Sequence, residues 1–193
     1  MRRADSSDTE PSLAKGVTMA VRRAPSGVFT SPMIPEGVTV APMDTGLVEE
    51  IYIAATETSP VTAVESVTAQ HGEGLEGDRY RQHNGWAPRG SAITLVEAEA
   101  VEAIADEFGI HLPPGGTRRN VVTRGIRLND LVGREFTVGP VRCLGYELCE
   151  PCAHLRAMTG EPQLIKALVH RGGLRADILT DGTIAVGDQV VGG

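Results

Sequence analysis

Two cysteines spaced C-x-x-C are the residues of this chain best suited to chemistry. Cys149 and Cys152 enclose Glu150-Pro151, and His154 follows two residues later. A thiolate is both a nucleophile and a soft metal ligand, so the pair could serve covalent catalysis or metal binding. His154 could assist the Cys152 thiol or carry a proton, provided that both side chains share one face of a strand.

The context of the pair leaves four interpretations open. In a thioredoxin-like protein the motif opens a helix within a βαβ unit, whereas the pattern here is that of strands. A structural zinc site needs four ligands, and Cys143 and His154 could complete the set. The cysteines could also be buried without a function. The remaining interpretation, which the strand context favours, is a reactive cysteine at a strand end, acting as nucleophile, sulfur carrier or molybdenum ligand.

The strand that delivers Cys149 is one of several. Val-, Ile- and Thr-rich runs between Gly and Pro predict strands over residues 46–55, 61–69, 91–96, 117–123, 134–139 and 141–148. An Ala- and Glu-rich run over residues 97–109 predicts the clearest helix, and a shorter helix is predicted near residues 162–170. Around Asp181-Gly182 a strand, a turn and a strand predict a hairpin. This pattern predicts a mainly β fold with one or two helices, a closed or nearly closed β-barrel.

Composition narrows the class of protein. The 193 residues give room for one domain, and a net charge of −7 argues against a nucleic-acid partner. No run approaches the roughly 18 apolar residues that span a membrane. Three cysteines make an odd count, so a reducing, cytoplasmic location is expected. Residues 1–44, rich in Ser, Thr, Pro, Gly and Arg, predict a disordered N-terminal extension before a domain at 46–191.

Five blocks in order give the sequence a resemblance to the MOSC domain family, named after the C-terminal domain of molybdenum-cofactor sulfurase. The resemblance covers roughly residues 46–191, and its blocks are Gly74–Tyr80, Ala92–Glu97, Arg119–Ile126, Cys149–Cys152 and Gly173–Asp188. The resemblance implies a β-barrel similar to the barrel domain of pyruvate kinase, in agreement with the strand pattern. The larger amidoxime-reducing relatives carry an additional N-terminal barrel domain, for which this sequence has no room.

The resemblance also implies roles for individual residues. Cys152 corresponds to the family's functional cysteine, which ligates molybdenum in members that bind the pterin cofactor and has been proposed to carry sulfur in others. Cys149 would be a helper or resolving thiol. Guanidinium groups suit a pterin phosphate and the oxo groups of molybdenum. The candidate cofactor-binding residues are polar members of the blocks: Arg119, Asn120, Arg79, Arg175 and Thr94.

The same residues could have purely structural roles. Each arginine could form a solvated ion pair on the surface instead, and Thr94 could be an ordinary strand residue. Asp78 could orient an arginine or act as a base, or it could cap a turn.

The sequence thus predicts a stand-alone MOSC-type protein. It would bind a molybdopterin-type cofactor or carry sulfur on Cys152, in sulfur transfer or in the reduction of N-hydroxylated compounds. Its partners would be a small-molecule substrate or cofactor and a protein donor of sulfur or electrons. The alternatives are a non-catalytic module that delivers cofactor or metal, and a zinc-stapled structural barrel. Pyridoxal phosphate, also associated with the family, belongs to the separate desulfurase domain of the larger sulfurases.

Overall fold

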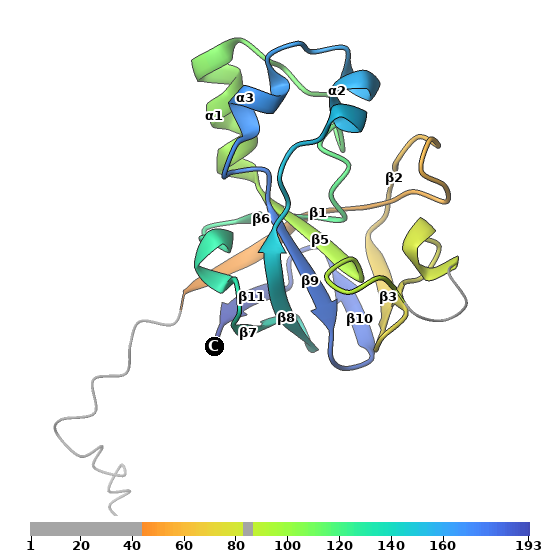
Figure 1. The fold of residues 1–193 in the computed structure, drawn as a ribbon. Helices are drawn as coiled ribbons and strands as arrows, with labels where there is room; N and C mark the ends of the chain where they lie inside the picture. The colour runs from red at the N-terminus through yellow and green to blue at the C-terminus, as the bar shows by residue number, and fades with distance from the viewer. Residues whose placement is uncertain (1–43, 83–86) are drawn as a thin grey trace, which may run out of the picture. The chain divides into compact units, whose positions relative to one another are not determined.

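Seven strands close into a β-barrel in the computed structural model, which describes residues 44–82 and 87–193 (Figure 1). Around the barrel the strands are β1 (Thr45–Ile53), β11 (Gln189–Gly192), β7 (Glu135–Val138), β8 (Val141–Leu148), β9 (Leu174–Ile178), β5 (Ile93–Glu97) and β6 (Val121–Arg124). The last strand in this order, β6, pairs with the first, β1, and this pairing closes the ring. All neighbours are antiparallel except β5 and β6. The prediction of a closed, mainly β barrel is confirmed.

A smaller sheet lies beside the barrel. Its strands, in order, are β10 (Gly182–Ala185), β3 (Ser66–Gln70) and β4 (Gly74–Leu75), and the short β2 (Thr62–Ala63) adds to the edge of β1. The strand predicted over residues 61–69 is therefore two strands in two sheets. The predicted hairpin around Asp181-Gly182 is wrong, because β9 pairs with β5 and β8 while β10 pairs with β3. The Asp181 carboxylate accepts the backbone N–H of His71 at 2.7 Å and so ties this corner to β3.

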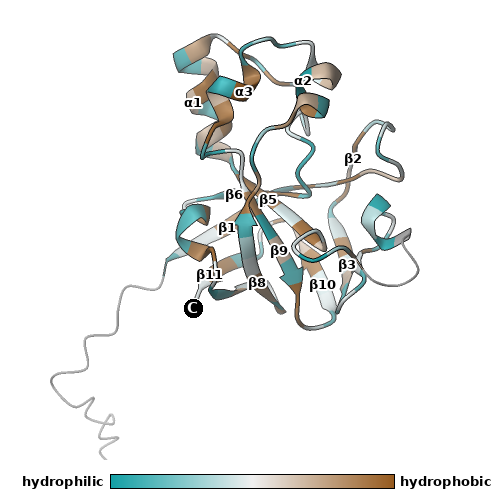
Figure 2. Ribbon diagram, in the orientation of Figure 1, coloured by the Kyte–Doolittle hydropathy of each residue, from teal (hydrophilic) through white to brown (hydrophobic). Residues whose placement is uncertain are grey.

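The barrel core follows from the two-residue period of a strand, which turns alternate side chains inward. In β7 and β8 the buried positions are Phe136, Val138, Val141 and Cys143. The alternation ends at a bulge between Gly145 and Glu147, where the pairing of β8 with β9 shifts by one residue. In Figure 2 polar and apolar colours accordingly both occur along the strands, and apolar colour is also prominent on α1 and α3.

Three helices gather at one end of the barrel (Figure 1). The first, α1 (Ala98–Phe108), connects the parallel strands β5 and β6, which no tight hairpin could join. Gly109 ends it in the left-handed conformation at φ 65°, which glycine adopts without strain. The other two are α2 (Ala153–Thr159) and α3 (Leu164–Leu168), whose apolar side chains form a second cluster with α1 around Ile104 and Leu155.

The helix predictions have a mixed outcome. The prediction for residues 97–109 is confirmed, and α3 lies inside the region predicted near residues 162–170. The α2 helix was not predicted. Two short 3₁₀ turns, η1 (Arg79–Gln82) and η2 (Leu128–Leu131), interrupt the connections. Among the described residues, none of the helices combines the length and apolar character needed to cross a bilayer. Most of the predicted extension, residues 1–43, lies outside the described residues.

Candidate functional site

The C-x-x-C motif runs from the end of β8 to the start of α2. Cys149 follows the last residue of β8 and is buried, with 8% of its surface exposed, and its backbone N–H donates to the carbonyl of Gly173 at 2.7 Å. Cys152 caps the first turn of α2 with an extended backbone, and its side chain is exposed. The motif therefore holds one buried and one accessible thiol, and both are free.

The guanidinium of Arg119 holds the backbone of this motif in place. Its Nη2 donates to the carbonyl of Cys149 at 2.9 Å, its Nε to that of Gly172 at 2.8 Å and its Nη1 to that of Thr117 at 3.2 Å. A Cβ on Gly172 would collide with the carbonyl oxygen of Cys149, so the approach requires a glycine. Arg119 was predicted to bind an anion, but three of the donors on its fork are directed at carbonyls. We therefore treat Arg119 as a positioning residue.

Charged groups surround the buried thiol. Burial raises the pKa of Cys149, and the guanidinium groups of Arg119 and Arg175 lower it, whereas Cys152 and Glu147 raise it further. The Nε of Arg175 lies 3.6 Å from the carboxylate of Glu147. The predicted site residue Arg175 lies in the neighbouring strand β9, opposite Glu147, and its guanidinium donates to the carbonyl of Gly90 and to the hydroxyl of Ser91.

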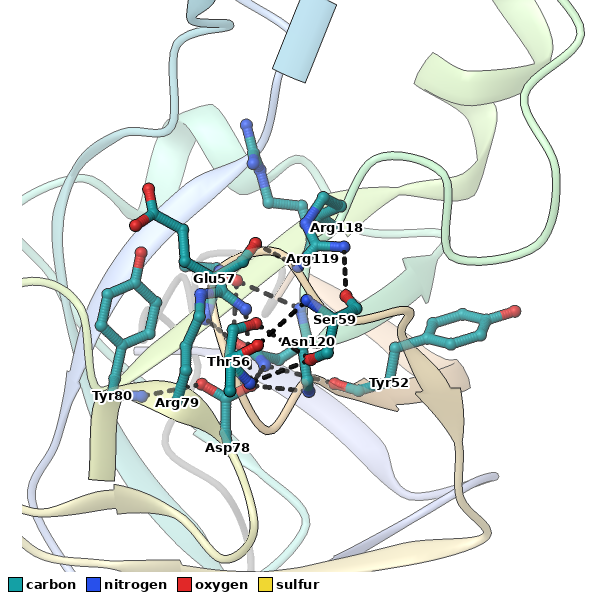
Figure 3. Close-up of polar contacts among 12 residues, drawn as sticks. Tyr52, Thr56, Glu57, Ser59, Asp78, Arg79, Tyr80, Arg118, Arg119 and Asn120 are labelled. Carbon is teal, nitrogen blue, oxygen red and sulfur yellow. Dashed lines mark hydrogen bonds and ion pairs between the residues drawn. The ribbon is translucent and has the colours of Figure 1, made fainter. Parts of the chain in front are cut away.

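Three further predicted residues, Asp78, Asn120 and Thr94, meet in a buried hydrogen-bond network (Figure 3 shows Asp78 and Asn120). The Asn120 amide donates to the Asp78 carboxylate at 3.1 Å and to the carbonyl of Tyr52 at 3.2 Å. Its oxygen accepts the Thr94 hydroxyl at 2.8 Å and the Thr94 N–H at 3.1 Å. Asp78 also accepts the N–H of Ala54 at 3.1 Å. The network joins β1, β5 and the start of β6 to the loop that carries Asp78. It therefore has a structural role.

Arg118 is a candidate that the sequence analysis did not select. It occupies the left-handed region at φ 58°, which is unusual for a residue with a side chain. Its guanidinium donates to the carbonyls of Ser59 at 2.9 Å and Glu57 at 2.8 Å, and burial followed by the charge of Arg79 lowers its pKa. The Nη1 of Arg79 lies 3.6 Å from the Oδ2 of Asp78 (Figure 3). We call the two guanidiniums of Arg79 and Arg118 the cationic pair.

A cavity of about 380 Å³ lies beside Arg118. Its wall combines the loop at Pro113–Gly116 with Met158 and Thr159 at the end of α2. The lining is mostly apolar, and it includes both the positive charge of Arg118 and the negative charge of Glu161. Because α2 begins after Cys152, the same short helix connects the accessible thiol to this cavity.

His154 and the proposed zinc ligands are arranged differently from the prediction. His154 lies in α2, so it does not share a strand face with Cys152, because residues two apart in a helix point in different directions. Cys143 is fully buried in the barrel core, where burial raises its pKa to about 12. Within residues 44–82 and 87–193, no three His, Cys, Asp or Glu side chains gather in a way that could hold a metal ion. This geometry does not support the zinc-stapled barrel.

Comparison with known proteins places these features in context. The family model described as the MOSC domain matches residues 75–191. No curated protein matches the sequence. The YuaD protein from Bacillus subtilis has a similar crystal structure, with a TM-score of 0.65 at 19% identity over 77% of this chain and 96% of that chain.

Two further crystal structures share the fold. YiiM from Geobacillus stearothermophilus has a TM-score of 0.59 at 18% identity, over 77% of this chain and 75% of that chain. YiiM from Escherichia coli has a TM-score of 0.56 at 15% identity, over 78% of this chain and 69% of that chain. At these identities the likeness concerns the fold alone.

Proposed function

The chain belongs to the MOSC domain family, which is associated with the molybdenum cofactor, and on this premise we propose that it binds a molybdopterin-type cofactor with Cys152 as the thiolate ligand of the metal. The observation that carries the proposal is the dipeptide Arg118-Arg119. Arg119 bonds the carbonyl of Cys149, and Arg118 belongs to the cationic pair. One dipeptide therefore holds a cluster of positive charge in the same region as an accessible thiol.

The residues present suit such a cofactor chemically. Its metal would accept a thiolate ligand, and the cofactor's own sulfur atoms leave few positions for protein ligands. A single accessible cysteine is therefore a fitting donor set. The cofactor's phosphate is an anion, for which the guanidiniums of Arg118 and Arg79 are suitable partners. When bound, the molybdenum centre supplies two-electron redox chemistry.

The protein's own contribution is to position these groups. Asp78 lies 3.6 Å from Arg79 and restrains it, and the carbonyls of Ser59 and Glu57 hold Arg118. The guanidiniums are thus fixed before an anion arrives, which lowers the entropy cost of binding. The cavity beside Arg118 offers an apolar wall for a small substrate. The reaction, sulfur transfer or reduction of an N-hydroxylated compound, is proposed from the family.

Metal analysis of protein purified from a host that makes the cofactor tests this proposal. We expect stoichiometric molybdenum in the wild type and in Cys149→Ala, and its loss in Cys152→Ala. Arg118→Ala should lower the cofactor content without changing the fold, which circular dichroism checks. Molybdenum retained by Cys152→Ala would overturn the role of that thiol. A protein that holds the cofactor but turns over no substrate would instead favour a delivery module.

A second candidate is sulfur carriage on Cys152 as a persulfide. The observation in its favour is the second thiol, Cys149, which stands three residues before Cys152 in the C-x-x-C motif and is also free. Cyanolysable sulfur on the wild type after exposure to inorganic polysulfide, absent from Cys152→Ala, is the expected result. The same low amount of cyanolysable sulfur on both proteins would exclude this candidate.

A further inference from the structure

The turn that follows α3 has a histidine where glycine is the usual residue. The N–H of Arg171 donates to the carbonyl of Leu168 at 3.0 Å, which closes a four-residue turn. Its two central residues are Val169, at φ −54° and ψ 127°, and His170, at φ 59°. These angles match a type II turn, whose third residue favours glycine because its φ is positive. Such a residue persists only where its surroundings compensate for the strain.

Contacts with Glu150 compensate for the strain at His170. The Oε2 of Glu150 accepts the backbone N–H of His170 at 3.1 Å, and its Oε1 lies 2.9 Å from the imidazole Nδ1. The amide of Asn129 donates to the carbonyl of His170 at 2.8 Å. The two backbone contacts would also be open to a glycine, so the contact of the imidazole with Glu150 is what the histidine adds. The His170 side chain is 77% exposed, and a pair of this kind adds little to overall stability.

Glu150 connects this turn to the C-x-x-C motif, because it is the first of the two residues between the cysteines. Pro151 comes next, and its ring fixes its own φ and limits Glu150 to extended conformations. A Cβ on Gly172 would lie 3.4 Å from the Cδ of Pro151, so the chain after His170 passes close to the proline. Both residues between the cysteines are therefore restrained by the segment that joins α3 to β9.

Cys152 directly follows this restrained pair and has few restraints of its own. Its side chain is exposed, and its backbone is extended at φ −123° and ψ 167°. Its carbonyl accepts the N–H of Arg156 at 3.2 Å and so begins α2, a helix of seven residues of which Leu155 is buried. Arg119 acts on the motif farther away, at the carbonyl of Cys149. The position of the accessible thiol therefore depends on how firmly Glu150 is held.

We propose that His170 is a positioning residue for Cys152: through Glu150 it holds the turn that leads into α2, so that the accessible thiol keeps one position. The inference rests on the proposed function, in which Cys152 is the thiol that binds the metal. A group that binds through a single thiolate loses less entropy when that thiolate is already in place. His170 acts through Glu150 and contacts neither the metal nor a substrate.

A nitroxide spin label on Cys152 tests the inference without any cofactor. Cys143 and Cys149 are buried, so a thiol-specific label reacts with Cys152 in the folded full-length protein. The comparison is with His170→Gly, which removes the imidazole and suits a positive φ. In its EPR spectrum the label should have a rotational correlation time at least about twofold shorter, because the turn before Cys152 has lost a restraint. The melting temperature should stay close to that of the wild type, because relief of the strained φ offsets the lost contact.

Variants of Glu150 and a matched control complete the comparison. Glu150→Gln keeps a side chain that can accept the N–H of His170 and bond its ring, so it should match the wild type. Glu150→Ala keeps neither contact and should match His170→Gly. The control is Glu107→Ala, which removes an exposed ion pair of 2.7 Å to Arg171, the residue after His170. That ion pair joins the turn to α1 instead of the C-x-x-C motif, so the motion of the label should not change.

Molybdenum content connects the position of the thiol to the proposed function. Each variant, unlabelled, is purified from a host that makes the cofactor, dialysed, and analysed for molybdenum per chain. His170→Gly and Glu150→Ala should retain at least about threefold less molybdenum than the wild type, because the thiolate is no longer held in place. Glu150→Gln and Glu107→Ala should retain as much as the wild type.

The outcomes separate the inference from the function on which it rests. Label motion that is the same in His170→Gly as in the wild type overturns the positioning role, whatever the metal content. Faster label motion with an undiminished molybdenum content also overturns it, because the position of the thiol then has no effect on binding. A wild type that holds no molybdenum refutes the proposed cofactor, and faster label motion in His170→Gly still supports the positioning of Cys152.

Discussion

Replacing Asn120 by Asp tests whether the buried network has the arrangement described. The substitution keeps the shape of the side chain but exchanges its amide donor for a carboxylate oxygen. Asn120 donates to Asp78 at 3.1 Å and to the carbonyl of Tyr52 at 3.2 Å, and both donations would be lost. Two buried carboxylates would then face one another at hydrogen-bond distance. The folded state can relieve this contact by binding a proton between them.

The expected cost follows from these two effects. Leaving the Tyr52 carbonyl without its donor costs about 1–3 kcal/mol. Holding a proton at pH 7 on a carboxyl group with an ordinary pKa near 3.9 costs about 4 kcal/mol. Together the loss is about 5 kcal/mol or somewhat more, a large part of a typical stability of roughly 5–15 kcal/mol.

The sign of the pH dependence follows from the same proton. At pH 7 the folded variant binds one proton more than the unfolded chain, so its stability falls as pH rises and recovers as pH falls. The recovery should be about 1.4 kcal/mol per pH unit, or roughly 3 kcal/mol between pH 7 and pH 5. This change is measured relative to the wild type, which lacks the second carboxylate.

Urea unfolding at pH 5, 6 and 7 measures both quantities. Asn129→Asp is the matched control, because Asn129 makes a single exposed hydrogen bond, to the carbonyl of His170, and should lose less than about 1 kcal/mol. The double variant Asp78→Asn/Asn120→Asp restores one acid and one amide and should lose the pH dependence. A cost below about 1 kcal/mol for Asn120→Asp, or the same cost at pH 5 and pH 7, would refute the described contact.

Other predictions concern the hydrogen bonds of Arg119, the loss of stability at alkaline pH and the close packing at Gly173. Arg119→Ala should lower the free energy of unfolding by about 2–4 kcal/mol in urea titration. Arg119→Lys should not restore it, because one ammonium cannot reach three carbonyls. Stability equal to that of the wild type would contradict the role of these hydrogen bonds. Burial, then the hydrogen bond to Glu50, raises the pKa of Tyr52 from 10.0 to about 12. Its contribution to stability is therefore present below pH 10 and lost as pH rises through about 12, and the late phase should vanish from the absorbance titration of Tyr52→Phe. Gly173→Ala should cost about 3 kcal/mol or more by thermal unfolding, because φ is 107° and a Cβ would collide with the carbonyl of Leu95; a normal melting temperature would refute this.

The residues predicted for the site fall into two separate groups in the structure. Arg119 contacts Cys149 at the end of β8 and Arg175 contacts Glu147 nearby, while Asp78, Asn120 and Thr94 form a separate buried network. Their types were recognisable in the sequence, but their partners were not, because most of those partners are backbone carbonyls. Arg119 bonds carbonyls 30 and 53 residues away, and such contacts leave no trace in local patterning.

The positions of Arg118 and His154 also depend on long-range contacts that the sequence does not reveal. The left-handed backbone of Arg118 depends on contacts with the loop at Glu57–Ser59, so the basic pair Arg118-Arg119 did not reveal which arginine joins Arg79. The helix α2 was missed because seven residues are too few to show a helical period, and packing of Leu155 against α1 and α3 stabilises it. The condition set for His154, a strand face shared with Cys152, is therefore not met.

By itself the sequence determined the barrel class, helix α1 with its glycine end, the order of the family's motifs and the cysteine pair as the candidate site. Those properties depend on local periodicity, turn residues and spacing, which a linear sequence contains. Tertiary structure alone decided that Cys152 is exposed, that Cys149 is fixed by Arg119, and that β10 leaves its expected hairpin for β3. Burial and long-range hydrogen bonding set these outcomes, and both arise only when distant segments pack together.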